Sequence, residues 1–169
     1  IKKAIVVADN IEFLKQCPCL EYLMIFPAIN ANEFDYSPLY DMPNIKWLKC
    51  ETMYGEDEEK VSTIDYSRFP DLKRLNVKGG KGHINVHTAK EVVALSLDFG
   101  FPISKTLTGF IPEGEIKNIS IRQSPIQSLE GIEAASKLCN LELSYNRRLT
   151  DISVLCNLSE TLRNVEIDT

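Results

Sequence analysis

The stretch Leu138-Cys139-Asn140-Leu141-Glu142-Leu143-Ser144-Tyr145-Asn146 carries the pattern that decides the fold. Aliphatic side chains stand at its first, fourth and sixth positions. Because side chains alternate between the two faces of a strand, Leu141 and Leu143 share one face of an expected strand, and Leu138 enters the same core from the preceding turn. One such triplet carries little information, since aliphatic residues are common. Its recurrence along the chain is the informative feature.

The triplet occurs seven times, and successive triplets begin 20 to 27 residues apart. The seven triplets are Leu20/Leu23/Ile25, Ile45/Leu48/Cys50, Leu72/Leu75/Val77, Val92/Leu95/Leu97, Ile116/Ile119/Ile121, Leu138/Leu141/Leu143 and Leu162/Val165/Ile167. A repeat that buries one apolar face cannot complete a core alone, so successive repeats must stack. The pattern therefore predicts a single α/β domain over residues 1–169, with a parallel sheet on one side and short return segments on the other.

Three stretches near the C-terminus resemble leucine-rich repeat proteins, in particular the short internalin-type repeats of bacteria. They are Ile126–Ile132 (I-x-x-L-x-G-I), Leu143–Asn146 (L-x-x-N) and Leu149–Leu155 (L-T-D-I-S-x-L). The resemblance implies a right-handed solenoid of about seven repeats. The parallel sheet would line its concave face, and short helices, 3-10 turns and loops its convex face. The resemblance also implies a protein that binds another polypeptide.

The resemblance implies that the asparagine of L-x-x-N is buried and bonds backbone groups along the turn, and the chain departs from the repeat pattern at this residue. Asn146 occupies that place, and Asn10 occupies it in Val7–Asn10. We interpret Val7–Asn10 as part of an eighth repeat, that is, a partial eighth rung of the stacked sheet. The equivalent places elsewhere hold Ala28, Met53, Gly80, Gly100 and Ser124. The middle of the sheet is therefore expected to be less regular. Longer loops are expected over residues 30–43 and 54–63, the second with the acidic run Glu56–Glu59 exposed to solvent.

Composition narrows the classes of protein that fit. The net charge is −5 and 44% of residues are hydrophobic, as in an ordinary globular domain, and the acidic balance argues against a nucleic-acid binder. No apolar run approaches the roughly 20 residues that cross a bilayer, so no membrane association is expected. Five irregularly spaced cysteines favour reduced thiols and a cytoplasmic location. Because the chain begins at Ile1 and not at Met, secretion stays open.

The sequence offers little that could support catalysis. His83 and His87 are the only histidines, and the preceding Gly79-Gly80-Lys81-Gly82 favours an exposed loop pair over a metal site. That glycine-rich segment also lacks the spacing of a phosphate-binding loop. No cysteine lies near the histidines along the chain. We therefore expect no enzyme activity, no metal and no cofactor.

The outward positions of the expected strands supply the candidate binding residues. Aromatic residues, Met and Arg are enriched where proteins bind proteins, and the first rungs place several of them outward. The candidate partner-binding residues are Tyr22, Met24, Phe26, Trp47, Lys49, Arg74, Lys78 and Arg122. The alternative is that an N-terminal flanking element covers Tyr22, Met24, Phe26 and Trp47.

The resulting hypothesis is a non-catalytic interaction module whose concave sheet binds a polypeptide. A second hypothesis is the recognition segment of a larger enzyme or of a toxin–immunity system. A third is a self-associating repeat, because the sequence ends at Asp168-Thr169 directly after an expected strand. Such an uncapped end could pair with a second copy to form a homodimer.

Overall fold

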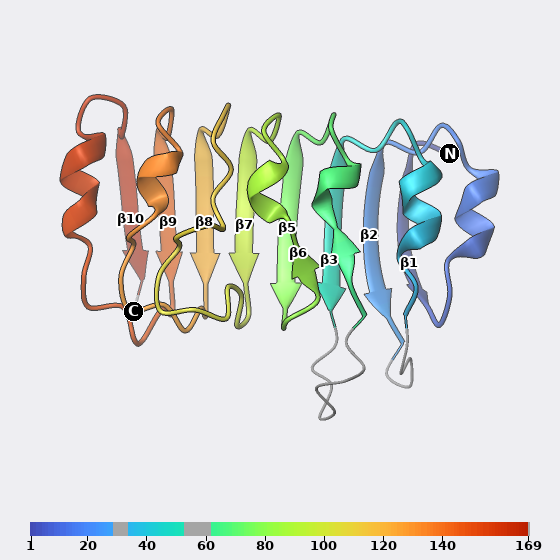
Figure 1. Cartoon of the computed structure of the whole chain (residues 1–169), viewed down its shortest axis with the longest axis horizontal. Coiled ribbons are helices and arrows are strands. Elements are labelled where there is room, and N and C mark those ends of the chain that lie inside the picture. The colour runs from blue at the N-terminus through green and yellow to red at the C-terminus, as the bar shows by residue number, and fades with distance from the viewer. Residues whose placement is uncertain (29–33, 53–61, 169) are drawn as a thin grey trace.

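The computed structural model describes residues 1–28, 34–52 and 62–168, and its main feature is one parallel sheet of eight strands. The strands follow one another across the sheet in chain order, as Figure 1 shows. They are β1 (Lys3–Ala8), β2 (Tyr22–Pro27), β3 (Trp47–Thr52), β5 (Arg74–Gly79), β7 (Ala94–Asp98), β8 (Asn118–Arg122), β9 (Asn140–Ser144) and β10 (Asn164–Asp168). Sequential stacking of this kind is compatible with an α/β solenoid.

The register of the sheet places the aliphatic triplets in ladders. Leu48 pairs with Leu75, Leu75 with Leu95, and Leu95 with Ile119, as the sequence pattern predicts. A second ladder passes through Ile25, Cys50, Val77, Leu97, Ile121, Leu143 and Ile167. In the first six triplets every member is buried. These ladders form the continuous apolar layer under the sheet, which is the main source of its stability.

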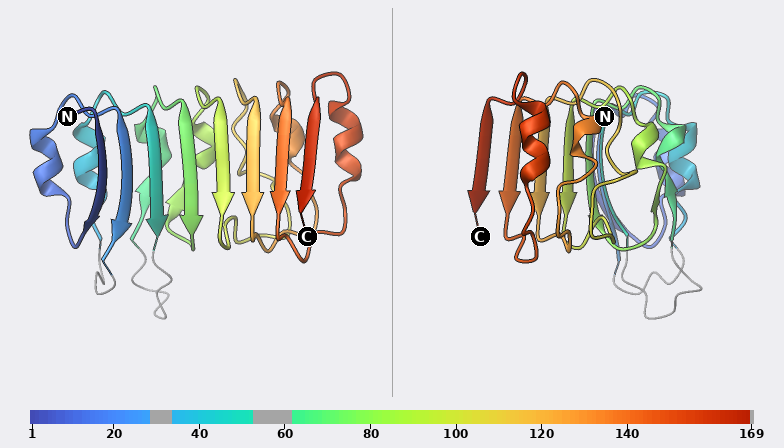
Figure 2. Two further views of the ribbon diagram at one scale, coloured as in Figure 1. Left: turned by 180° about the vertical axis from the view of Figure 1, so that it is seen from behind. Right: turned by 60° about the vertical axis from the view of Figure 1, so that its left-hand side comes forward.

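Short 3-10 helices return the chain along one face of the sheet, which Figures 1 and 2 show from the front, from behind and obliquely. They are η1 (Glu12–Gln16), η2 (Ser37–Asp41), η3 (Tyr66–Arg68), η4 (Val86–Thr88), η5 (Ile132–Ala134) and η6 (Ser153–Leu158). A two-stranded parallel sheet of β4 (Ile64–Asp65) and β6 (His83–Ile84) lies in the same layer. We call the sheet face away from these helices the open face.

Asn146 fulfils the role that the L-x-x-N pattern predicts. Its side chain is 8% exposed. Oδ1 accepts a hydrogen bond of 2.9 Å from the backbone N–H of Ser124, and Nδ2 donates one of 2.8 Å to the carbonyl oxygen of Ile121. The amide therefore joins the turn after β9 to the end of β8 and to the turn that follows it. Asn10, by contrast, is exposed, and the pairing of Val6 with Ile25 puts Asp9 and not Asn10 in the equivalent place, so the prediction of the same role for Asn10 is wrong.

Several expectations need correction or fall outside the described residues. The N-terminal rung is a complete six-residue strand, not a partial one. The seventh triplet is not fully buried, since Val165 is 45% and Ile167 49% exposed on β10. β10 is an outer strand of the sheet, and no strand of the described residues pairs with its free edge. The place of Met53 in the repeat and the acidic run Glu56–Glu59 lie outside the described residues.

Candidate functional site

The open face carries an apolar cluster at its N-terminal end, which we call the apolar patch. It consists of Ile5, Val7, Tyr22, Met24, Phe26 and Trp47, on β1, β2 and β3. The register places Ile5 beside Met24, Val7 beside Phe26, and Tyr22 beside Trp47. The rings of Tyr22 and Trp47 lie 6.2 Å apart between centroids in a tilted arrangement. Three adjacent strands thus present one continuous apolar surface.

The apolar patch is open to solvent in the described part of the chain. The exposed fractions are 62% for Ile5, 71% for Val7 and 43% for Tyr22, while Met24, Phe26 and Trp47 are half-buried. The 3-10 helices lie on the opposite face of the sheet (Figure 2). Side chains of this size are costly to leave in water, and contiguous exposed apolar surface often marks a binding site.

Ile5 and Val7 were not among the residues that the sequence predicted for this surface. They lie in the run Ala4-Ile5-Val6-Val7-Ala8, where every residue is apolar. Such a run is typical of a strand buried on both faces, and the usual alternation of apolar and polar residues is absent. The pairing of β1 with β2 was the missing information, because it turns Ile5 and Val7 to the side of Met24 and Phe26.

Two of the predicted cations, Lys49 and Arg74, border the apolar patch, and the other two, Lys78 and Arg122, lie beside carboxylates. Lys49 borders the apolar patch, with Nζ 5.8 Å from the centroid of the Phe26 ring, a cation–π distance. Arg74 is exposed beside Trp47 and forms no ion pair with any residue that the structure describes. Lys78 instead pairs with Glu51 at 2.9 Å.

Arg122 lies far from the apolar patch. It is on β8, three strand spacings or roughly 14 Å from β3. Its guanidinium group is 3.7 Å from the carboxylate of Glu142. The structure therefore brings Tyr22, Met24, Phe26, Trp47, Lys49 and Arg74 together and leaves Arg122 at a separate, more polar place.

The C-terminal half of the open face is polar. Asn164 donates to Asn140 at 2.6 Å and Asn140 donates to Asn118 at 2.7 Å, so the three amides form a ladder across β8, β9 and β10. Glu142 and Glu166 are register neighbours beside it. These residues line a shallow hollow of about 430 Å³ that also contains Ser96 and Ser120. The open face therefore changes from apolar to acidic along the sheet.

The expectation that both histidines are exposed is wrong for His83. His83 lies on β6 and is 5% exposed, whereas His87 is exposed. The ring of His83 packs between those of Tyr66 and Phe101, whose centroids lie 5.9 Å and 5.2 Å from its own. Burial lowers the pKa of His83 from 6.5 to about 4. Both ring nitrogens are hydrogen-bonded inside the protein, so this histidine has a packing role.

A search of the described residues finds no group of three or more His, Cys, Asp or Glu side chains that could hold a metal ion. In the same residues, no helix combines the length and the apolar character that a bilayer crossing needs. The sequence matches no protein-family model, and none of the curated proteins compared with it is a match.

Proposed function

We propose that this chain is a non-catalytic protein-interaction module that binds a polypeptide partner on the open face of its sheet. In this proposal the chain is a right-handed leucine-rich repeat solenoid of about seven repeats, preceded by β1, and the open face is its concave face. The seven triplets in register and the internalin-type segments support the family. Parallel crossover connections are almost always right-handed, which supports the handedness.

The exposed apolar patch is the observation that carries the proposal. Ile5, Val7 and Tyr22 are each more than two-fifths exposed on the side of the sheet that no described helix covers. Trp and Tyr dominate the binding energy of many protein interfaces, and here Tyr22 and Trp47 are in ring contact. Lys49 and Arg74 border the patch with positive charge, which favours a partner that combines apolar side chains with nearby carboxylates.

The proposal assigns the chain no metal, cofactor, nucleic acid or membrane as a ligand. The negative net charge and the lack of a metal-ligand cluster among the described residues support that assignment. All five cysteines are unpaired thiols, which supports a reducing compartment such as the cytoplasm.

The test is capture of a partner by the immobilised protein from a lysate of the source organism, followed by measurement of the binary affinity. The double variant Tyr22→Glu/Trp47→Glu places two carboxylates in the apolar patch. We expect its affinity for the captured protein to fall by at least about a hundredfold, the effect of losing two central aromatic contacts. Circular dichroism and melting temperature should stay close to those of the wild type, since neither side chain belongs to the core.

Phe13→Glu is the matched control. Phe13 is 48% exposed, as Tyr22 is at 43%, but it lies on η1, in the helical layer. The control should retain the partner. Undiminished binding by the double variant, or equal loss in the control, would contradict a partner site on the open face.

Self-association is a second candidate function, supported by the exposed apolar side chains of β10. Val165 and Ile167 lie in the ladder of core residues but are 45% and 49% exposed. Pairing of β10 with a second copy would cover them and would give a homodimer. Light scattering should then report a dimer that Ile167→Lys converts to monomer. A monomer at all concentrations, or a dimer unaffected by Ile167→Lys, would rule out this contact.

A further inference from the structure

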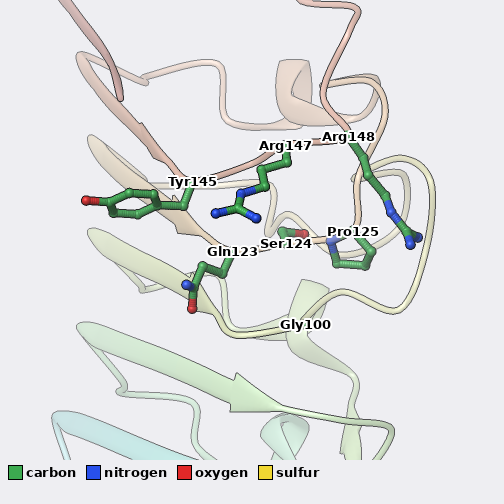
Figure 3. A pocket seen from close by; sticks show the side chains of 7 residues that line it. All are labelled: Gly100, Gln123, Ser124, Pro125, Tyr145, Arg147 and Arg148. Atoms are coloured by element: carbon green, nitrogen blue, oxygen red, sulfur yellow. The ribbon is translucent and has the colours of Figure 1, made fainter. Parts of the chain in front are cut away.

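A second hollow lies at the carboxyl ends of the strands, away from the apolar patch. It has a volume of about 430 Å³ and is shown in Figure 3. The side chains that line it are Gln123, Ser124, Pro125, Tyr145, Arg147 and Arg148. They come from the turn after β8 and the turn after β9, which the stacking of two successive repeats brings together.

The turn that carries the two arginines is held at both ends. The backbone N–H of Leu149 donates to the carbonyl oxygen of Asn146 at 2.9 Å, so Arg147 and Arg148 occupy the middle of a β-turn. The buried amide of Asn146 fixes the start of this turn through its bonds to Ser124 and Ile121. Leu149 fixes its end by packing against the hydrophobic core. The backbone below both guanidinium groups is therefore preorganised.

The hollow is rich in hydrogen-bond donors and has no carboxylate in its lining. Arg147 and Arg148 are exposed and form no ion pair with any described residue. Their side chains extend to opposite sides of Pro125: the guanidinium group of Arg147 lies between Tyr145 and Ser124, above Gln123, and that of Arg148 lies beyond Pro125 (Figure 3). Ser124 is 5% exposed, and its Oγ has no hydrogen-bond partner among the described residues. An anion above Pro125 would have a cation on either side.

From this arrangement we infer that the hollow binds a phosphate monoester. Arginine forms paired hydrogen bonds with phosphate oxygens, and a doubly charged tetrahedral group can accept bonds from donors on several sides. A carboxylate has two oxygens in one plane and suits a single arginine fork better. The hollow is large enough for the phosphate and part of the group that bears it. Arg147 and Arg148 supply the donors, one from each side of the anion.

The experiment is a titration of the ¹⁵N-labelled full chain followed by amide chemical shifts, with inorganic phosphate and a short phosphoserine peptide as separate probes. The unphosphorylated peptide and sodium chloride at matched ionic strength are the references. We expect saturable shifts at the amides of Gln123, Ser124 and Tyr145 with both phosphate probes. The double variant Arg147→Gln/Arg148→Gln should bind at least about tenfold more weakly, the effect of losing a charge-assisted hydrogen bond.

Arg163→Gln is the matched control, because Arg163 is also an exposed arginine but precedes β10, at the amino ends of the strands. It should keep the wild-type affinity. Tighter binding of the phosphoserine peptide than of inorganic phosphate would identify a phosphorylated polypeptide as the source of the group, and the reverse order would identify a small phosphate. Shifts that do not saturate, or shifts that persist unchanged in the double variant, would overturn the inference. The apolar patch takes no part in this test, so its outcome is independent of the proposed function.

Discussion

The hydroxyl group of Tyr66 lies 2.9 Å from Nδ1 of His83, and Nε2 of the same ring lies 2.9 Å from the carbonyl oxygen of Lys78. A carbonyl oxygen only accepts hydrogen bonds, so Nε2 carries the ring proton. Tyr66 therefore donates to Nδ1, and the imidazole is neutral. Protonation of Nδ1 would break this bond and would place a charge in a site that is 5% exposed.

We predict that the stability of the protein falls as the pH is lowered from about 6.5 to about 4. Burial lowers the pKa of His83 from 6.5 to about 4, while the bond to Lys78 opposes this shift. Between these values the unfolded chain binds a proton that the folded chain does not, so acid favours unfolding. Below the folded pKa both states are protonated and the loss is complete. A shift of this size corresponds to about 3 kcal/mol in the free energy of unfolding.

Urea unfolding at a series of pH values measures this effect. His83→Gln should be less stable at neutral pH but should have a flatter dependence between pH 4 and 6.5. His87→Gln changes an exposed histidine and should keep the wild-type dependence. An unchanged slope in His83→Gln would assign the acid sensitivity to other groups.

A second prediction concerns two neighbouring buried polar side chains with opposite hydrogen-bonding status. Asn146→Ala leaves the buried N–H of Ser124 and the carbonyl of Ile121 without their partner, and should cost about 2–4 kcal/mol. Ser124→Ala removes a buried Oγ that has no partner among the described residues, and should change stability by less than about 0.5 kcal/mol or increase it. Thermal and urea unfolding of the two variants check this contrast. Equal losses would mean that the Ser124 hydroxyl contributes to the fold.

The sheet could be predicted from the sequence because the triplets keep their register through every rung. Leu48, Leu75, Leu95 and Ile119 pair as neighbours since a one-residue slip would turn each apolar set to the other face. The burial of Asn146 followed from the repeat pattern for a similar reason. The side-chain amide of Asn146 finds its two hydrogen-bond partners only where the turn after one strand stacks on the turn of the preceding repeat.

The surface features were harder to predict because they depend on contacts between repeats. Nothing in Ala4–Ala8 indicates which apolar residues face outward until β1 is paired with β2. His83 follows a glycine-rich segment that suggests a loop, yet the β4–β6 pair places it against Tyr66. The hollow lined by Arg147 and Arg148 combines residues from two successive repeats, and no local sequence motif marks it.

A third prediction compares two isoleucines in one ladder of the core. Ile121 is completely buried between β7 and β9, whereas Ile167 on β10 is 49% exposed. Ile121→Ala should cost about 2–5 kcal/mol, because it removes buried apolar surface and leaves a cavity. Ile167→Ala should cost less than about 1 kcal/mol. Chemical unfolding of both variants gives the comparison. A large loss at Ile167 would show that another surface covers this end of the sheet in solution, and would thereby support self-association.

The last prediction concerns the glycine of the return segment Ile126–Ile132. Gly131 has φ +98°, and a Cβ there would overlap the backbone of Leu107 and Thr108 in the preceding repeat. Gly109 has a similar φ of +80°, but a Cβ there would meet no atom within 4 Å. Gly109→Ala should therefore cost only the conformational strain of about 1–2 kcal/mol. Gly131→Ala adds a clash with the backbone and should cost more than about 3 kcal/mol. Because both glycines have a positive φ, the difference between the melting temperatures of the two variants chiefly reports the close approach of the two repeats. Equal melting temperatures would contradict that approach and would leave the glycine explained by its φ alone.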